Sequence, residues 1–95
     1  MLMMTTTPTV EGKPVKDYLG IVSGETILLG DIFSGLSGIE KVFLDARHLA
    51  LAKLSAQAAA LGANAIVGVS FDYELAGVAR MVFATGTAVL LPSTE

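Results

Sequence analysis

The sequence predicts an α+β domain with the element order β-β-α-β-β, in which one long helix packs on an antiparallel or mixed sheet. Three observations predict this class. A run free of Gly and Pro and rich in Ala, Leu and Lys occupies the middle of the chain. Segments rich in β-forming residues precede it, and a segment of alternating apolar and polar residues follows it. Because the 95 residues contain no internal repeat and no linker, residues 1–95 are expected to form a single domain.

Two strands are expected before the helix. Residues 3–7 are β-prone and end at Pro8, and residues 10–14 have the composition of a turn. Residues 15–29 are rich in β-forming side chains and predict a longer strand with a kink at Ser23–Gly24. Residues 30–38 contain three glycines and two serines, which predicts a loop.

The helix has clear signals at both ends. Ser37 and Glu40 have the spacing of a capping box, in which each side chain accepts a hydrogen bond from a free backbone N–H group near the other residue. The helix is then expected to continue to Leu61, and Gly62 stands where a left-handed C-terminal cap is favoured.

The predicted helix has more apolar surface than one sheet contact requires. At 100° per residue, the apolar arc is roughly 220° wide, about twice the ~100° of an ordinary surface helix. The central apolar face holds Ile39, Phe43, Ala46, Ala50, Leu54 and Leu61. Val42 and Leu49 flank it on one side, Leu44 and Leu51 flank it on the other, and the polar strip holds Lys41, Asp45, His48 and Ser55. A neighbouring subunit is the natural cover for the flanking stripes.

The segment after the helix alternates with the period of a half-buried strand. One side is expected to present Val67, Val69, Phe71, Tyr73 and Leu75, and the other Gly68, Ser70, Asp72 and Glu74, with Ile66 as an exception to the pattern. Residues 76–79 are expected to form a hairpin turn, and residues 80–91 to return as a strand that ends at Pro92.

The composition limits the class of protein. Hydrophobic residues make up 53% of the chain and charged residues 16%, where about 25% charged is usual, so we expect a membrane protein or an oligomer. The uncharged stretch between Lys53 and Asp72 is interrupted by polar residues and changes its periodicity, which argues against a membrane-spanning helix. An oligomer therefore remains, and no membrane association is expected.

Charge and cysteine content exclude further classes. The six Lys and Arg residues are scattered and the net charge is −3, which argues against nucleic acid as a partner. The absence of Cys excludes a disulfide framework and a thiolate nucleophile, and it is compatible with the reducing cytoplasm. The N-terminus has no signal-peptide pattern, so a cytoplasmic location is expected.

Asp72 and Glu74 are the first candidate ligand-binding residues. Two residues apart on a strand, they project from the same face with Cα atoms about 7 Å apart. Such a pair suits a hard divalent cation or acid–base chemistry. The alternative is a solvated sheet face on which Glu74 pairs across the hairpin with Arg80. A cation would need more oxygen ligands than these two residues supply.

The remaining candidates are weaker. His48 lies in the polar strip of the helix with Leu44 and Ala52 at the i−4 and i+4 positions, so metal binding there requires ligands from other subunits. The methionines 1, 3 and 4 are a concentration of soft ligands that packing explains equally well. No motif supplies a nucleophile or a phosphate-binding loop, so no catalytic residue and no enzymatic activity are expected. Two alternatives to a binding module remain. One is a hydrolase or isomerase that uses Asp72, Glu74 and Arg80 in an interface cleft, and the other is a purely structural scaffold.

Several sequence blocks together resemble a known family. They are Thr5-Thr6-Thr7-Pro8-Thr9 running into Gly12-Lys13, Tyr18-Leu19-Gly20-Ile21-Val22 running into Gly24-Glu25, residues 60–69 around Leu61-Gly62-Ala63-Asn64-Ala65, the Asp72-Tyr73 pair, and Gly86-Thr87-Ala88-Val89. In this order and spacing the chain resembles, over nearly its whole length, the YbjQ-like family of small bacterial and archaeal proteins labelled as heavy-metal-binding.

The resemblance implies a β-β-α-β-β domain that assembles as a ring-like homopentamer, with no established enzymatic activity. It also implies a metal ion, here a divalent one, as the candidate cofactor; the small ligand itself stays unidentified. The selenium-binding cysteine of an archaeal member has no counterpart, because this chain has no Cys. The segment between Ile32 and the helix is also shorter than the family pattern, so a ligand site built from that segment does not carry over.

Overall fold

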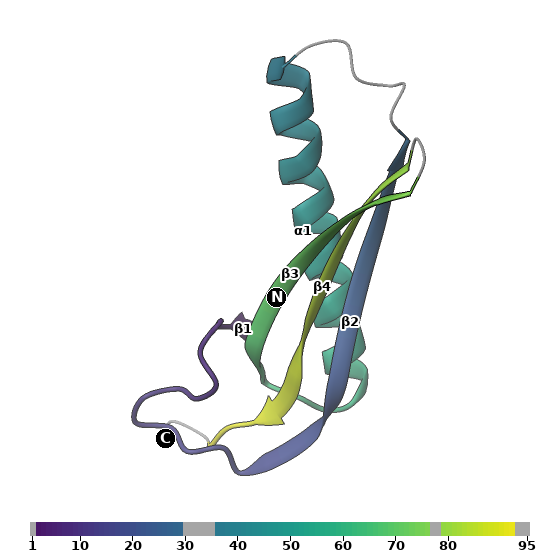
Figure 1. Cartoon of the computed structure of the whole chain (residues 1–95). Coiled ribbons are helices and arrows are strands. Elements are labelled where there is room, and N and C mark those ends of the chain that lie inside the picture. The colour runs from purple at the N-terminus through teal and green to yellow at the C-terminus, as the bar shows by residue number, and fades with distance from the viewer. Residues whose placement is uncertain (1, 30–35, 77–78, 93–95) are drawn as a thin grey trace.

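The computed structural model describes residues 2–29, 36–76 and 79–92. Its elements are β1 (Met3–Met4), β2 (Asp17–Leu29), α1 (Leu36–Ala60), β3 (Ala65–Ala76) and β4 (Ala79–Leu90) (Figure 1). This order confirms the predicted α+β class. The first strand is shorter than residues 3–7, and the expected turn residues 77 and 78 lie outside the described residues, although the strands on either side pair as expected for a hairpin.

The sheet is mixed and has four strands in the order β1-β3-β4-β2. The central strands β3 and β4 are antiparallel, β2 pairs antiparallel with the other side of β4, and β1 pairs in parallel with the start of β3. In the sheet, β4 lies between β2 and β3. The segment that connects β2 with β3, which contains α1, must therefore pass over β4. Figure 1 shows α1 lying against one face of this sheet.

The main core lies between α1 and the sheet. Ala46, Ala50 and Leu54 are fully buried, as the helical periodicity predicts, and Ala58 continues the same face. They pack against buried side chains of the strands, among them Val22, Ile66, Val69, Val82, Ala84 and Ala88. Leu61 departs from the prediction: it lies beyond the end of the helix and is 46% exposed. The side chains of residues 39 and 43 lie outside the described part of the structure.

The two ends of α1 match the prediction unequally. The helix begins at Leu36, so Ser37 lies inside its first turn and is not the residue that precedes it; sequence signals locate helix ends only to within one or two residues. The C-terminal prediction is confirmed. Gly62 has φ +86°, its N–H donates to Ala59 O at 3.0 Å, and Ala63 N–H donates to Ala58 O at 3.2 Å, which is a Schellman motif.

Two bulges change the strand pattern. The pairing of β2 with β4 shifts between Tyr18 and Gly20, whereas it is regular at Ser23 and Gly24, so the kink expected there is wrong. The pairing of β3 with β4 shifts between Val67 and Ser70, at Gly68 with φ +63°. An extra residue reverses the alternation, and this is why Ile66 packs under the helix.

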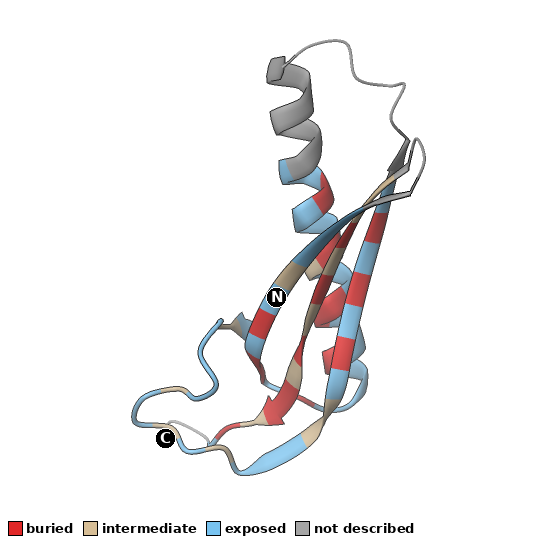
Figure 2. Cartoon of the chain, in the orientation of Figure 1, coloured by how far each residue is buried: buried red, intermediate tan, exposed pale blue. Residues whose placement is uncertain are grey.

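Val67 belongs instead to a second, smaller core on the far face of the sheet. Its buried members are Ala65, Val67, Val89 and Leu91, and Val10 and Val15 pack against them. The chain between β1 and β2 therefore covers one end of this face. No described residue covers the rest of this face, and we call it the open face (Figure 2). It presents Ile21, Glu25, Ile27, Asp72, Glu74, Met81 and Phe83.

The open face and the flanks of the helix expose large apolar side chains. On β2, Ile21 is 85% exposed and Ile27 57%, and on α1 Leu44 and Leu49 are about half exposed. A single chain therefore exposes more apolar surface than its own fold covers, as the wide apolar arc of the helix predicted. Ser55 corrects the predicted polar strip: it is buried, and its Oγ accepts a hydrogen bond from Leu2 N at 3.3 Å. Among the described residues, no helix combines the length and apolar character needed to span a membrane.

Candidate functional site

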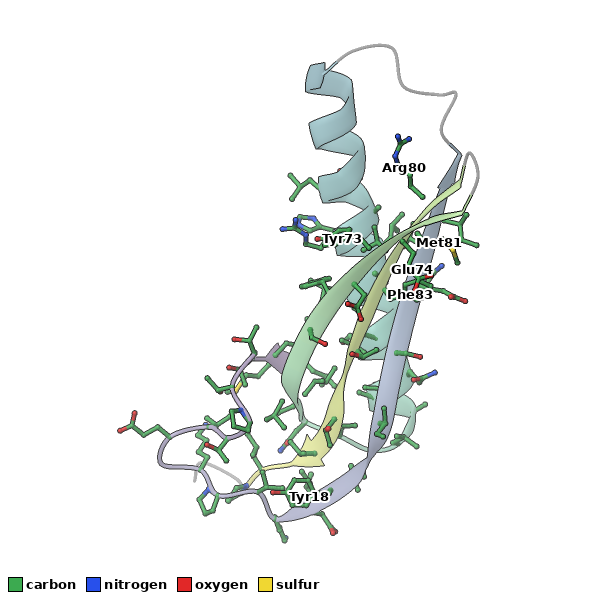
Figure 3. The ribbon with its side chains drawn as sticks, in the orientation of Figure 1. Tyr18, Tyr73, Glu74, Arg80, Met81 and Phe83 are labelled. Carbon is green, nitrogen blue, oxygen red and sulfur yellow. The ribbon has the colours of Figure 1, made fainter. Side chains whose placement is uncertain are left out.

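The carboxylates of Asp72 and Glu74 lie on the open face. On β4, Val82 and Ala84 are buried under the helix, so the residues that alternate with them point to the other side. Asp72 is paired with Phe83 and Glu74 with Met81, and directly paired residues share a face. The prediction that both carboxylates project from one face is confirmed, and both are exposed. Figure 3 labels Glu74 together with its neighbours Met81 and Phe83 on β4.

The sheet order brings a third carboxylate to the same face. Glu25 on β2 is also paired with Phe83, so Asp72, Phe83 and Glu25 form one row across three strands. With neighbouring strands ~4.8 Å apart, the Cα atoms of Asp72 and Glu25 are about 10 Å apart. Glu25 was not predicted as a site residue, because only the order β3-β4-β2 places it near Asp72.

Met81 is the second residue that the sequence did not indicate. It lies directly opposite Glu74 and brings a thioether sulfur, a soft metal ligand, beside a carboxylate. The register also corrects an expectation about Arg80, which is paired with Leu75 and so belongs to the face opposite Glu74. The hairpin register, which the local sequence does not fix, decides both positions.

The structure does not bring His48 to the carboxylates. His48 is exposed on α1, which covers one face of the sheet, whereas Asp72 and Glu74 lie on the other. Of the predicted methionine cluster, Met3 is 46% exposed, whereas Met4, the next residue of the strand, packs against the main core; residue 1 lies outside the described residues. Within the part of the chain that the structure describes, no three His, Cys, Asp or Glu residues form a metal-binding group. The described residues of one copy therefore supply an incomplete set of ligands.

The two outer edges of the sheet differ in how they are protected. At the centre of β2, Ser23 N–H donates to Gln57 Oε1 at 2.7 Å, and Lys53 Nζ donates to Glu25 O at 2.8 Å. These helix side chains satisfy backbone groups that a further strand would otherwise bind. On the other edge, no described strand pairs with the outer side of β3 beyond Val69. The unprotected edge is thus the one beside Asp72 and Glu74.

Comparison with known proteins agrees with this fold. The family model YbjQ_1, described as "Putative heavy-metal-binding", matches residues 2–92. Among solved structures, the chain is similar to a DUF74-family protein of unknown function from Pediococcus pentosaceus. The TM-score is 0.71 and the sequence identity 23%, over 96% of this chain and 98% of the other. At that identity the similarity supports the fold alone.

Proposed function

The chain belongs to the YbjQ family, and we propose that it is a homo-oligomeric binding module that holds a metal ion or small ligand where two copies meet. The observation that carries this proposal is that Asp72 and Glu74, on the open face, are too few to complete the ligand shell of a cation. They also lie beside the edge of β3 that, beyond Val69, no described strand or side chain protects. A ring of five copies is the assembly that the family resemblance implies, and it is the subunit number we propose.

Exposed apolar surface supports the oligomer. Ile21 and Ile27 stand 85% and 57% exposed on the open face, and burying side chains of this size stabilises an interface by about 1.5–3 kcal/mol each. Tyr18, which is 68% exposed, lies on the same strand. A second copy that covers the open face would remove all three side chains from water.

Ligand arithmetic supports a site between copies. A hard cation takes six or more oxygen ligands, and Asp72 and Glu74 supply four carboxylate oxygens at most. Within one chain, the ring of Phe83 separates these residues from Glu25. Carboxylates of a second copy, approaching along the unprotected edge of β3, would complete the shell. The Met81 thioether would add a preference for softer metals.

Two alternatives compete with the binding module. A purely structural scaffold shares its apolar interfaces and needs no ligand. A hydrolase or isomerase would need Arg80 beside Asp72 and Glu74, and the register puts Arg80 on the other face of the hairpin. This position of Arg80 supports the binding module over the enzyme, and we propose a module without catalytic residues. With no cysteine in the chain, the reducing cytoplasm is the compartment that we propose.

Native mass spectrometry of the untagged protein, purified without chelators, tests the assembly. A mass of five subunits is expected, and a reproducible metal or small-molecule adduct would support the binding module. A pentamer that takes up no added ligand would favour the scaffold. A monomer at micromolar concentration would contradict the proposed assembly.

The cation site is tested by titrating Mn²⁺, which prefers oxygen ligands, into the oligomer by calorimetry. The double variant Asp72→Asn/Glu74→Gln should abolish binding, because it removes both charges while keeping the size of the side chains. The matched control Glu11→Gln/Asp45→Asn loses the same charge at exposed positions away from the open face and should bind normally. Equal loss in both double variants would indicate a general effect of charge and would contradict a site at Asp72 and Glu74.

A further inference from the structure

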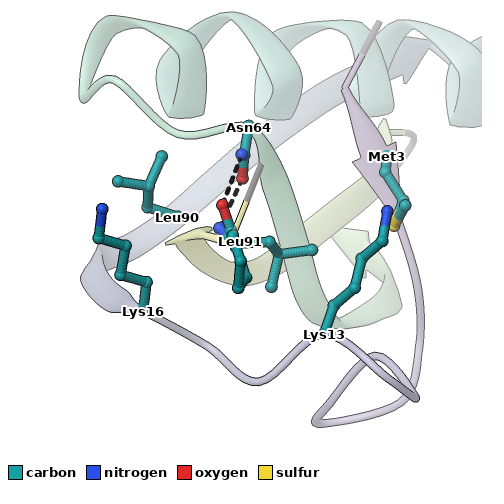
Figure 4. A pocket seen from close by; sticks show the side chains of 7 residues that line it. Met3, Lys13, Lys16, Asn64, Leu90 and Leu91 are labelled. Atoms are coloured by element: carbon teal, nitrogen blue, oxygen red, sulfur yellow. Dashed lines mark hydrogen bonds between the residues drawn. The ribbon is translucent and has the colours of Figure 1, made fainter. Parts of the chain in front are cut away.

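A second candidate site lies at the opposite end of the sheet from the carboxylates. It is a cavity of about 430 Å³ lined by Met3, Lys13, Lys16, Asn64, Leu90, Leu91 and Pro92 (Figure 4). Asn64 precedes β3 and Leu91 follows β4, whereas Asp72 and Glu74 lie toward the other end of the hairpin. Along the strand, nine residues at ~3.3 Å separate Ala65 from Glu74, which places the two sites on the order of 30 Å apart.

One wall of this cavity is held in place by two hydrogen bonds between the Asn64 side chain and the Leu91 backbone. Asn64 Nδ2 donates to Leu91 O at 3.0 Å, and Leu91 N donates to Asn64 Oδ1 at 2.8 Å. Both bonds are drawn in Figure 4. They fix the end of β4 against the start of β3 and leave Leu91 buried. Asn64 is thereby a positioning residue for the pocket wall.

The two lysines are anchored through their backbones as well. Lys13 N donates to Val10 O at 3.1 Å in a turn where Gly12 has φ +78°, and Lys16 N donates to Leu90 O at 2.8 Å. Pro14, between them, fixes one further backbone angle. The stems of both lysines therefore start from defined positions, and Figure 4 shows them on either side of Leu91.

The charge of this cavity is positive, in contrast to the chain as a whole. The chain carries a net charge of −3, but the residues that line the cavity include two lysines and no Asp or Glu. Within the described residues, neither ammonium group has a hydrogen bond or an ion pair. The other lining side chains, apart from Asn64, are apolar. Two cations without a partner among the described residues, over an apolar floor, match a ligand with an anionic head and an apolar body.

We propose that this cavity binds a small organic anion, whose carboxylate or phosphate group is attracted by the positive charges of Lys13 and Lys16 and whose apolar body contacts Leu90, Leu91 and Met3. Lysine acts as a point charge toward such oxyanions, so its ammonium suits either head group. The volume is within the range of small-molecule pockets, about 300–1,000 Å³. This site is independent of the carboxylates on the open face, so either proposal can fail without the other.

The test is an NMR titration of the full chain labelled with ¹⁵N. Phenyl phosphate, benzoate and the neutral benzamide serve as probes at low, constant ionic strength. Saturable shifts of the Asn64 and Leu91 amide signals are expected with the two anions and not with benzamide. Tighter binding of benzoate, despite its single charge, would favour a carboxylate head group, whereas tighter binding of phenyl phosphate is expected from its second negative charge alone.

Charge-removing variants locate the site. Lys13→Gln and Lys16→Gln should each weaken anion binding by roughly two- to fivefold, the range of exposed charge pairs, and the double variant by about tenfold. Lys53→Gln is the matched control, because it removes one positive charge at a lysine whose Nζ binds Glu25 O outside this cavity. The proposal is overturned if benzamide binds as well as benzoate, if no anion saturates the signals at millimolar concentration, or if Lys53→Gln has the same effect as the cavity variants.

Discussion

Replacing Gly24 by alanine should separate β2 from α1. A Cβ atom added at Gly24 would lie 2.2 Å from Ala50 O and 2.8 Å from Leu54 N, both of which are helix backbone atoms. The backbone angle of Gly24 lies outside the left-handed region, so conformational strain does not contribute. The cost of this substitution therefore measures how closely the helix and the strand approach.

The magnitude follows from the distance that must be gained. Ordinary contact begins at 3.4 Å, so the Ala50 carbonyl and the new Cβ must move apart by about 1.2 Å. Neither atom belongs to a flexible side chain, and the helix and the strand must shift as bodies. A gap of ~1 Å forfeits a quarter to a half of the dispersion energy of the contacts across it. A shift of whole elements puts the gross cost at the upper end of the overpacking range, about 3 kcal/mol. Alanine also restricts the unfolded chain, which offsets ~0.4–1 kcal/mol, so we expect a net loss of about 2–2.6 kcal/mol.

Urea denaturation followed by circular dichroism, at one fixed protein concentration, measures the free energy of unfolding. The control is Gly12→Ala, where the added Cβ meets nothing within 4 Å and the cost comes from a φ of +78° alone, about 1 kcal/mol. If Gly24→Ala is as stable as the native chain, or no less stable than Gly12→Ala, the close helix–strand approach is wrong.

Three further outcomes are expected. Asn64→Ala should cost about 2–3 kcal/mol in the same urea assay, because it removes both hydrogen bonds to the backbone of Leu91; a loss below 1 kcal/mol would contradict their role. Arg47→Ala should cost only ~0.5–1 kcal/mol, since its guanidinium carbon lies 5.6 Å from the centre of the Phe71 ring at a partly exposed site, and Arg47→Lys should recover part of this loss. Ile21→Asp should lower the oligomeric mass in size-exclusion chromatography while the circular dichroism spectrum stays native, and an unchanged mass would place the interface away from the open face.

Features set by local chemistry were predictable from the sequence. The helix, its buried face at Ala46, Ala50 and Leu54, and its glycine cap at Gly62 depend on residues a few positions apart. The shared face of Asp72 and Glu74 depends on strand periodicity alone and was also predicted correctly.

Features set by pairing between distant segments were not predictable. Gly20, Gly24 and Gly68 look alike in the sequence, but two of them make bulges and one allows a helix to approach. The place of Glu25 in the same row as Asp72, on the far side of Phe83, depends on the strand order, which local periodicity does not contain. The sequence did not indicate a site at Lys13 and Lys16. The cavity that they line also needs Asn64 and the end of β4, which lie about 50 or more residues further along the chain.

The protection of the sheet edges limits how copies of the chain can join. A strand added to the centre of β2 would have to displace the Gln57 and Lys53 side chains from Ser23 N–H and Glu25 O, and each lost hydrogen bond costs about 0.5–1.5 kcal/mol. The outer side of β3 beyond Val69 has no such protection among the described residues. Contact through this edge or through the open face therefore has the lower cost, and both surfaces border Asp72 and Glu74. The proposed function therefore predicts that assembly and cation binding are coupled. Neutralising the two carboxylates with Mn²⁺ should stabilise the oligomer against dilution, and Asp72→Asn/Glu74→Gln should stabilise it without the metal.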